Sequence, residues 1–215
     1  MRRPLVRVRS VVVTGCSTGI GRTAARVLQQ RGWRVVPTAR KRGDLDSLRA
    51  EGFEPLHLDL ADESSVAAAA EETLERLRDG LGGIVNNAGI GVGGAVEDLS
   101  RAALRQQFEV NVFGLVDFTN RLLPAMRRQG WGRIVNVSSV LGRVATPMVG
   151  AYCASKFALE ALSDAWRVEL WDTGLAICLI EPGPIESAFR RNAAETSARF
   201  LDPNHSRFRE DIRRE

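Results

Sequence analysis

The chain has 215 residues, of which 44% are hydrophobic and 26% charged, a balance typical of one α/β domain with a sizeable core. This composition excludes a disordered chain, a collagen-like repeat and a disulfide miniprotein, and no apolar run reaches the roughly 18 residues of a membrane span. The isoelectric point near 9.5 raises the possibility of nucleic-acid binding, but arginines alternate with acids and aromatics total only 6%, so we expect no nucleic-acid partner.

Short apolar runs alternate along the chain with longer segments of helical periodicity. Strands are predicted at residues 11–13, 34–36, 54–58, 83–85, 133–137 and 175–180. Helices are predicted at residues 19–30, 43–50, 61–78, 100–128 and 152–171. Apolar strands that each precede a helix favour a parallel sheet covered on both faces. The expected fold is therefore a Rossmann-type, doubly wound α/β domain with three layers.

A glycine-rich turn follows the first predicted strand and reads Thr14-Gly15-Cys16-Ser17-Thr18-Gly19-Ile20-Gly21. Gly15 permits a tight turn, Gly19 allows close approach to phosphates, and Gly21 allows close helix packing. The helix that begins here would point its N-terminus at a pyrophosphate. A plain glycine turn is the simpler alternative, but the strand-to-helix context favours a dinucleotide site.

The second predicted strand ends in Pro37-Thr38-Ala39-Arg40-Lys41-Arg42, without the acid that would bind the 2′-hydroxyl of NAD. Arg40 could instead hold a 2′-phosphate with two hydrogen bonds. We therefore expect NADP(H) to be preferred, with NAD(H) also possible. The alternative is a solvated basic loop.

A tyrosine and a lysine four residues apart, Tyr152 and Lys156, lie in the last long predicted helix. This spacing places both side chains on one helical face. A lysine charge about 5 Å away contributes roughly 3 kcal/mol at an effective dielectric of about 20, which would bring the tyrosine pKa toward neutrality. The pair therefore indicates acid–base chemistry, although an aromatic ring packed on a lysine stem has the same spacing.

Metal and disulfide chemistry are not expected. The cysteines Cys16, Cys153 and Cys178 form no metal-binding pair, and the two histidines belong to no ligand cluster. The basic N-terminus lacks the apolar stretch of a secretory signal. We expect free thiols, no metal, no membrane association and a cytoplasmic location.

The sequence resembles the short-chain dehydrogenases/reductases of the compact main branch. Several motifs in the family order carry the resemblance over residues 8 to 190: the glycine turn 14–21, Asp59, Asn86-Asn87-Ala88-Gly89, Asn111, Ser138-Ser139, Tyr152-x-x-x-Lys156 and Pro182-Gly183. The residues in these motifs most resemble those of 17β-hydroxysteroid and retinol dehydrogenases. The resemblance implies an enzyme of this family that interconverts an alcohol and a carbonyl.

The resemblance also assigns catalytic roles. Tyr152 would exchange a proton with the substrate oxygen, and Ser139 would hydrogen-bond that same oxygen. Lys156 would lower the tyrosine pKa and bind the nicotinamide ribose. Asn111 would mark a helix kink that holds a water in the proton relay.

Further cofactor contacts are implied where the later strands end. Asp59, followed by Leu60, would accept a hydrogen bond from the adenine amino group. The other implied contacts are Asn87, Ala88 and Gly89 at the adenine ribose, and Pro182, Gly183, Ile185 and Ser187 near the nicotinamide.

The domain prediction places a dinucleotide-binding catalytic domain at residues 1–191 and a C-terminal substrate segment at 192–215. That segment is rich in arginine, and we interpret it as a mobile loop or a surface helix, truncated relative to the family pattern. The expected pocket wall, mostly apolar, consists of residues 91–94, 141–148 and Phe189. It favours a hydrophobic small molecule, such as a steroid, a retinoid or a ketone. The alternative is a catalytically idle sensor or scaffold that binds NADP(H).

A homodimer or homotetramer is expected. The predicted helices at 104–126 and 152–171 are apolar around more of their circumference than one buried face requires. The family pairs these helices between subunits.

Overall fold

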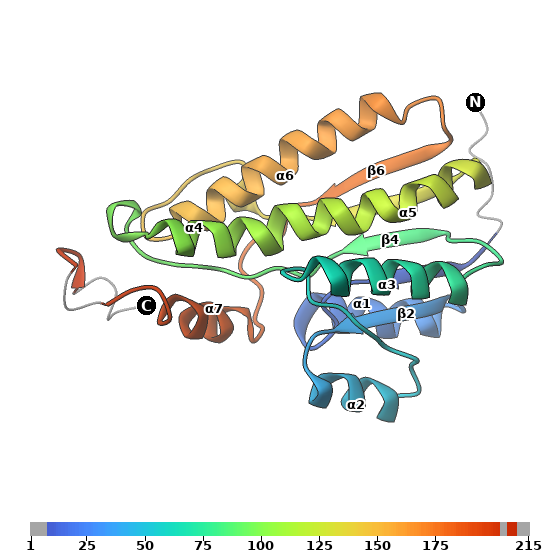
Figure 1. Cartoon of the computed structure of the whole chain (residues 1–215), viewed down its shortest axis with the longest axis horizontal. Coiled ribbons are helices and arrows are strands. Elements are labelled where there is room, and N and C mark those ends of the chain that lie inside the picture. The colour runs from blue at the N-terminus through green and yellow to red at the C-terminus, as the bar shows by residue number, and fades with distance from the viewer. Residues whose placement is uncertain (1–7, 203–205, 210–215) are drawn as a thin grey trace.

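The computed structural model describes residues 8–202 and 206–209, and its described strands form one parallel sheet (Figure 1). The strands are β1 (Ser10–Val13), β2 (Arg34–Ala39), β3 (Leu56–His57), β4 (Gly83–Asn86), β5 (Gly132–Val137) and β6 (Leu175–Ile180). Their order is β3-β2-β1-β4-β5-β6, and every pair is parallel. This order reverses direction at β1, so the predicted doubly wound Rossmann topology is confirmed.

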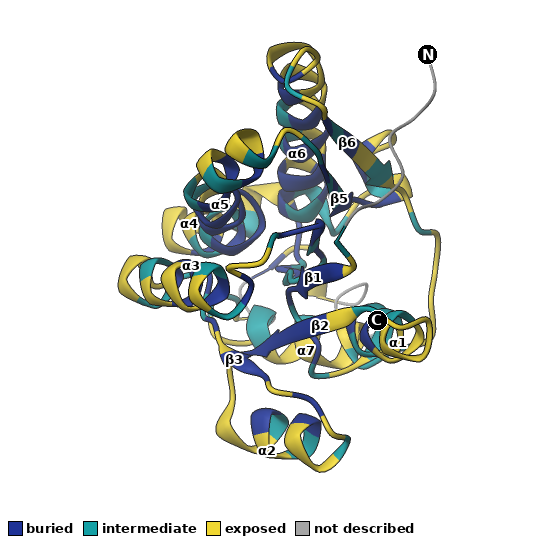
Figure 2. Ribbon diagram, turned by 90° about the vertical axis from the view of Figure 1, so that its right-hand side faces the viewer, coloured by how far each residue is buried: buried dark blue, intermediate teal, exposed yellow. Residues whose placement is uncertain are grey.

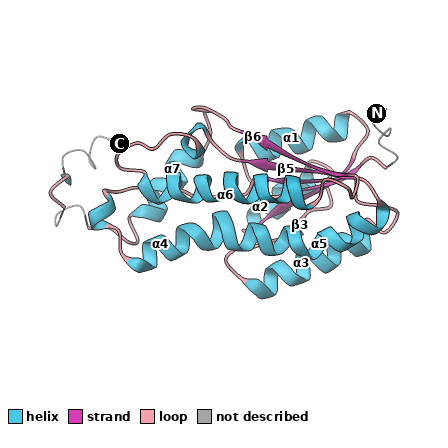
Figure 3. Cartoon of the chain, turned by 90° about the horizontal axis from the view of Figure 1, so that it is seen from above, coloured by secondary structure: helices cyan, strands magenta, loops and turns pink. Residues whose placement is uncertain are grey.

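Helices cover both faces of the sheet (Figure 3). They are α1 (Gly19–Gln30), α2 (Arg42–Ala50), α3 (Glu63–Arg76), α4 (Arg101–Phe108), α5 (Leu115–Gln129), α6 (Gly150–Glu169) and α7 (Phe189–Ser197). None of the helices in the described part of the chain is long and apolar enough to cross a membrane.

Alternating side chains of β1 divide the core into two clusters, one on each side of the sheet. Val12 belongs to the cluster that packs under α3, α5 and α6. Val11 and Val13 belong to the other cluster, which packs against α1 and α2. Figure 2 shows the central strand buried between these layers. Because both faces are buried, the strand is apolar from Val11 to Val13, as its sequence indicates.

The single helix predicted over residues 100–128 is divided in the structure. A π-helical segment, Glu109–Gly114, separates α4 from α5. Gly114 lies so close to the Leu60 carbonyl that any Cβ at this position would overlap it. Such π-segments occur mostly at functional sites, and this one carries Asn111 into the interior.

The C-terminal segment contains α7, which begins at residue 189 and therefore spans the predicted boundary at 191. Its Ser197 hydroxyl accepts a hydrogen bond of 2.8 Å from the Gly93 amide, and Ser206 donates one of 2.6 Å to Asp98. The segment is thus packed on residues 91–98 as a surface helix. Residues 203–205 and 210–215 of the predicted segment lie outside the described residues.

Candidate active site

A cleft of about 340 Å³ lies where the strands end. All but two of the predicted site residues line it: Gly15, Ser17, Thr18, Gly19, Ile20, Arg40, Asp59, Leu60, Asn87, Ala88, Gly89, Ser139, Tyr152, Lys156, Pro182, Gly183, Ile185 and Ser187. The remaining two, Gly21 and Asn111, are buried behind it. The parallel sheet brings these distant residues together, because the carboxyl ends of its strands share one edge.

The glycine turn is fixed to the end of β4 by hydrogen bonds. The Thr14 hydroxyl accepts hydrogen bonds of 3.0 Å from the amides of Asn87 and Ala88. The Asn87 side chain donates to the carbonyls of Thr14 and Gly15. Gly15 has a φ of +72°, and a Cβ there would lie 2.7 Å from the Ala88 Cα. Only glycine fits this contact.

The N-terminus of α1 opens into the cleft with features that fit a bound phosphate. Thr18, the N-cap residue, makes no side-chain capping hydrogen bond, and the first turn of the helix contains no acid. Gly19 has a φ of +59°, and both residues line the cleft. Uncapped amides and the positive end of the helix dipole form an anion site. The arrangement fits the pyrophosphate of a dinucleotide.

Arg40 lies at the end of β2, beside Asp59 at the end of β3. The two form a loose ion pair of 3.9 Å, and the Arg40 side chain is 47% exposed. Asp59 also accepts a hydrogen bond from the Ala61 amide. Lys41 lines the same part of the cleft. The guanidinium and the lysine therefore face the ligand space, where a negatively charged group would be stabilised.

Tyr152, Ser139 and Lys156 meet at the other end of the cleft. The Ser139 side chain lies close enough to the Tyr152 hydroxyl to act on the tyrosine pKa. The Lys156 ammonium lies 5.7 Å from the centre of the tyrosine ring and donates a 2.8 Å hydrogen bond to the Val137 carbonyl. The three residues come from the end of β5 and from α6, so only the tertiary structure brings Ser139 to the tyrosine.

The pKa values of this group differ from the sequence-based expectation. Burial raises the pKa of Tyr152, and the interaction with Ser139 only partly opposes this effect. Burial also lowers the pKa of Lys156 to about 8, opposed by the Glu160 carboxylate. The predicted lowering of the tyrosine pKa by Lys156 is therefore not found: burial dominates both pKa values, because both groups are withdrawn from water.

Two residues that the sequence analysis missed, Gln107 and Ser155, hold Asn111 and the loop after β4. Gln107 accepts a hydrogen bond from the Val92 amide at 2.7 Å and donates to the Ile90 carbonyl. Asn111 donates to the same carbonyl and to the Ser155 hydroxyl. The four-residue spacing of Gln107 and Asn111 is a signal that could have found this pair.

The predicted pocket wall is only partly correct. Gly91 and Phe189 line the cleft, and the Phe189 ring lies 5.5 Å from that of Tyr152. Val92 is fully buried and faces the interior. Residues 141–148 are absent from the cleft lining, and most of them are exposed. In their place α7 adds a partly polar wall of Asn192, Ala193, Glu195, Thr196 and, just beyond the helix, Arg199.

The fold and the cleft define a Rossmann-type α/β protein with a ligand site at the carboxyl edge of its sheet. The family model described as short chain dehydrogenase matches residues 9–198. The chain therefore belongs to the short-chain dehydrogenase/reductase family, and it is an oxidoreductase acting on CH–OH groups.

Two curated relatives and one solved structure illustrate the similarity. The chain is 46% identical over 193 residues to the uncharacterized oxidoreductase YbbO of Escherichia coli K12, with 90% of this chain and 72% of that protein covered. It is 41% identical to human retinol dehydrogenase 16, covering 91% of this chain and 61% of the relative. A Burkholderia phymatum short-chain dehydrogenase/reductase in complex with NAD superposes with a TM-score of 0.81 at 25% identity, covering 96% of this chain and 78% of that one.

Proposed function

We propose that this enzyme interconverts an alcohol and a carbonyl on a hydrophobic small molecule, with NADP(H) as cofactor and Tyr152 as general acid/base. The observation that carries the proposal is the meeting of the Tyr152 hydroxyl with Ser139 in front of Lys156, inside the cleft that begins at the glycine turn.

Each residue of this group has a separate task. Ser139 and Tyr152 hydrogen-bond the substrate oxygen together, and in the oxidation direction the tyrosine receives the proton of the alcohol. A nicotinamide bound in this cleft would supply the hydride acceptor for oxidation of the carbinol carbon and the hydride donor for reduction of the carbonyl. The Lys156 ammonium stabilises the tyrosinate by its charge. Asn111, fixed by Ile90 and Ser155, keeps the π-helical segment against the lysine.

The preference for NADP(H) is supported by the positions of Arg40 and Lys41. Two cations directly after β2 line the cleft, and the acids from the neighbouring elements that also line it are Asp44 of α2 and Asp59 after β3. A 2′-phosphate carries nearly two negative charges, which Arg40 can bind in a bidentate manner. The same arrangement offers no equivalent advantage to NAD(H).

A hydrophobic substrate is supported by the residues around the tyrosine. The Phe189 ring packs beside Tyr152, and Gly91 and Ile185 border the same space. The human relative is named retinol dehydrogenase 16, and retinol is an apolar alcohol. This similarity favours the same class of substrate. The alternative of an idle cofactor sensor is disfavoured, because a binding module does not need a serine, a tyrosine and a lysine that meet at one point of the cleft.

Replacing Tyr152 with Phe tests the proposal. The variant lacks only the hydroxyl, so turnover of a panel of apolar alcohols and ketones should fall by about 10²–10⁴-fold. NADPH affinity should stay within about twofold, which controls for folding of the cleft. Wild-type turnover by the variant would show that the proposed mechanism is wrong. A wild-type protein that binds NADPH and turns over none of the panel would favour the sensor.

A further inference from the structure

The acidic residue Glu160 lies in α6, one helical turn beyond Lys156, and is almost completely buried. Its side chain is 5% exposed, and Arg143 lies 2.8 Å from its Oε2 as an ion pair. Among the described residues neither carboxylate oxygen has a well-aligned hydrogen-bond donor. Burying a carboxylate with so few hydrogen bonds costs free energy, and an apolar residue of similar size would avoid that cost. The acid therefore calls for an explanation beyond packing.

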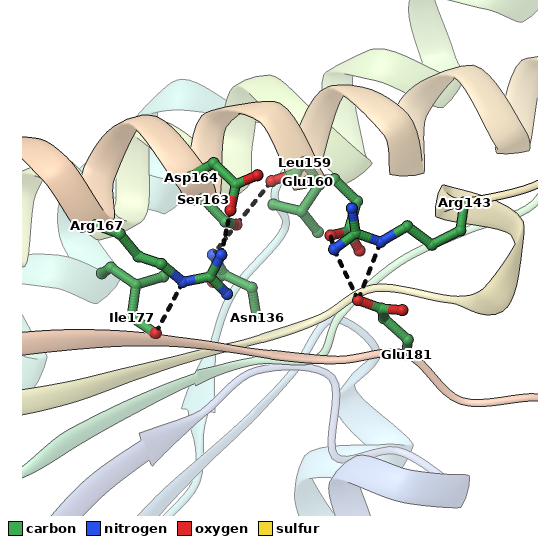
Figure 4. A network of polar contacts seen from close by, with 9 residues as sticks. All are labelled: Asn136, Arg143, Leu159, Glu160, Ser163, Asp164, Arg167, Ile177 and Glu181. Atoms are coloured by element: carbon green, nitrogen blue, oxygen red, sulfur yellow. Dashed lines mark hydrogen bonds and ion pairs between the residues drawn. The ribbon is translucent and has the colours of Figure 1, made fainter.

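Arg143 connects Glu160 to two other segments of the active site (Figure 4). Arg143 closes the short 3₁₀ turn whose N-cap is Ser139. Its guanidinium also donates hydrogen bonds of 3.0 and 3.2 Å to Glu181, which directly precedes Pro182. One side chain thus joins the serine turn after β5, the tyrosine–lysine helix and the loop after β6.

We infer that Glu160, held by Arg143, is a positioning residue that supplies the buried negative charge for the Lys156 ammonium behind Tyr152. The inference rests on the proposed acid–base function of Tyr152 and Lys156. Residues four apart on a helix face the same side, so the carboxylate of Glu160 acts on the ammonium across one turn.

The charges around Lys156 determine in which direction its pKa changes when Glu160 is replaced. Burial lowers the pKa of Lys156 to about 8, and the charge of Glu160 is the influence that raises it. Tyr152 faces the lysine from the same helix. Arg143 from the serine turn pairs with Glu160, and Glu181 after β6 and Asp164 from α6 act in turn on the charge of Arg143. Removing the Glu160 charge should therefore make Lys156 lose its proton at lower pH.

Nuclear magnetic resonance tests this directly in the protein without substrate, because the chain contains only two lysines, Lys41 and Lys156. With lysine labelled at the ε-carbon, the variant Lys41→Arg assigns the two signals. Glu160→Gln should move the midpoint of the Lys156 titration to lower pH. Glu169→Gln is the matched control, since it removes an exposed charge from the far end of the same helix and should leave the midpoint unchanged.

The pH dependence of turnover distinguishes this role from a merely structural one. Glu160→Gln should lose about fivefold at pH 8 but less than about twofold at pH 6.5, the pattern expected when Lys156 loses its proton earlier. The KM for NADPH at pH 6.5 should be unchanged.

An equal loss of turnover at all pH values, or a Lys156 titration that is the same in Glu160→Gln and wild type, would overturn the inference. The two proposals fail separately. A Tyr152→Phe variant that keeps its turnover removes the proposed mechanism whatever the resonance titration gives. An inactive Tyr152→Phe variant together with an unshifted Lys156 removes only the role of Glu160.

Discussion

Single side chains in the cleft differ in how firmly the protein holds them. Asn111 and Gln107 are fully buried, and both their amide groups are hydrogen-bonded to the loop after β4. Arg40 is half-exposed, and its ion pair with Asp59 is 3.9 Å long. The residues that we propose to align the reacting groups are thus fixed before any ligand binds, while the cation that we propose to bind a phosphate is free to adjust to it. Rigid alignment is where preorganisation contributes most.

The role of Arg40 can be tested by replacing it with alanine. Loss of charge-assisted hydrogen bonds to a 2′-phosphate should weaken NADPH binding by about 10- to 100-fold, with little change for NADH. Calorimetric titration with both cofactors measures this ratio. Arg42→Ala is the matched control, because Arg42 begins α2 and is absent from the cleft lining. Equal weakening of NADPH and NADH binding by Arg40→Ala would contradict the assignment.

Helices and strand ends are positioned around the cleft by close backbone contacts at glycines, where no side chain would fit. The glycine turn approaches the end of β4 at Gly15, the first turn of α1 does so at Gly21, and Gly114, directly before α5, lies against the Leu60 carbonyl. The π-helical segment before α5 then turns Asn111 inward. These contacts bring the helix N-terminus, the β4 loop and the catalytic helix to one edge of the sheet, where the cleft lies.

Gly21→Ala should disrupt the glycine turn. A Cβ at residue 21 would overlap the Asn87 side chain and the Gly15 carbonyl, so the turn must shift. We expect NADPH affinity to fall by at least about tenfold and the protein to be destabilised by about 1–3 kcal/mol. Urea unfolding and cofactor titration measure the two effects.

Gly43→Ala provides the comparison for that variant. No atom lies within 4 Å of the position of a Cβ at residue 43, in the first turn of α2. Alanine there should leave cofactor affinity unchanged and stabilise the protein by up to about 1 kcal/mol. If both variants behave alike, the close packing at Gly21 is not what shapes the site.

The molecule as a whole buries its two core clusters but leaves large apolar side chains exposed on neighbouring helices. Leu104 of α4, Phe113 of the π-helical segment and Phe157 of α6 are 38%, 52% and 44% exposed. Aromatic residues exposed in this way are enriched where proteins associate. These exposed apolar side chains form the candidate contact surface of the predicted homodimer or homotetramer.

Light scattering after size exclusion should give a mass of at least twice the 23.6 kDa of the chain. Phe113→Glu should shift the protein toward monomer, because it places a charge in the apolar contact. Val168→Glu is the control, since Val168 is 74% exposed at the other end of α6. A monomeric wild-type protein would contradict the prediction of self-association.

The sequence determined the order of the elements and the parallel sheet, and most of the site residues that it predicts line the cleft. Alternating apolar runs and helical periods are local signals, and the glycine turn and the Tyr152–Lys156 pair are short motifs that sequence displays directly. The sequence also predicted a longer strand at residues 54–58 than the structure contains. β3 begins only after Pro55, because proline has no N–H to donate to a neighbouring strand.

Only the tertiary structure decided which distant residues share a surface. It placed α7 over the loop after β4, turned Val92 into the interior, and broke the long helix at Asn111. It also joined Arg143, Glu160 and Glu181, which lie on three separate segments. Periodicity shows which face of an element is buried, whereas burial of a charge and its effect on a neighbouring pKa depend on what packs against that face.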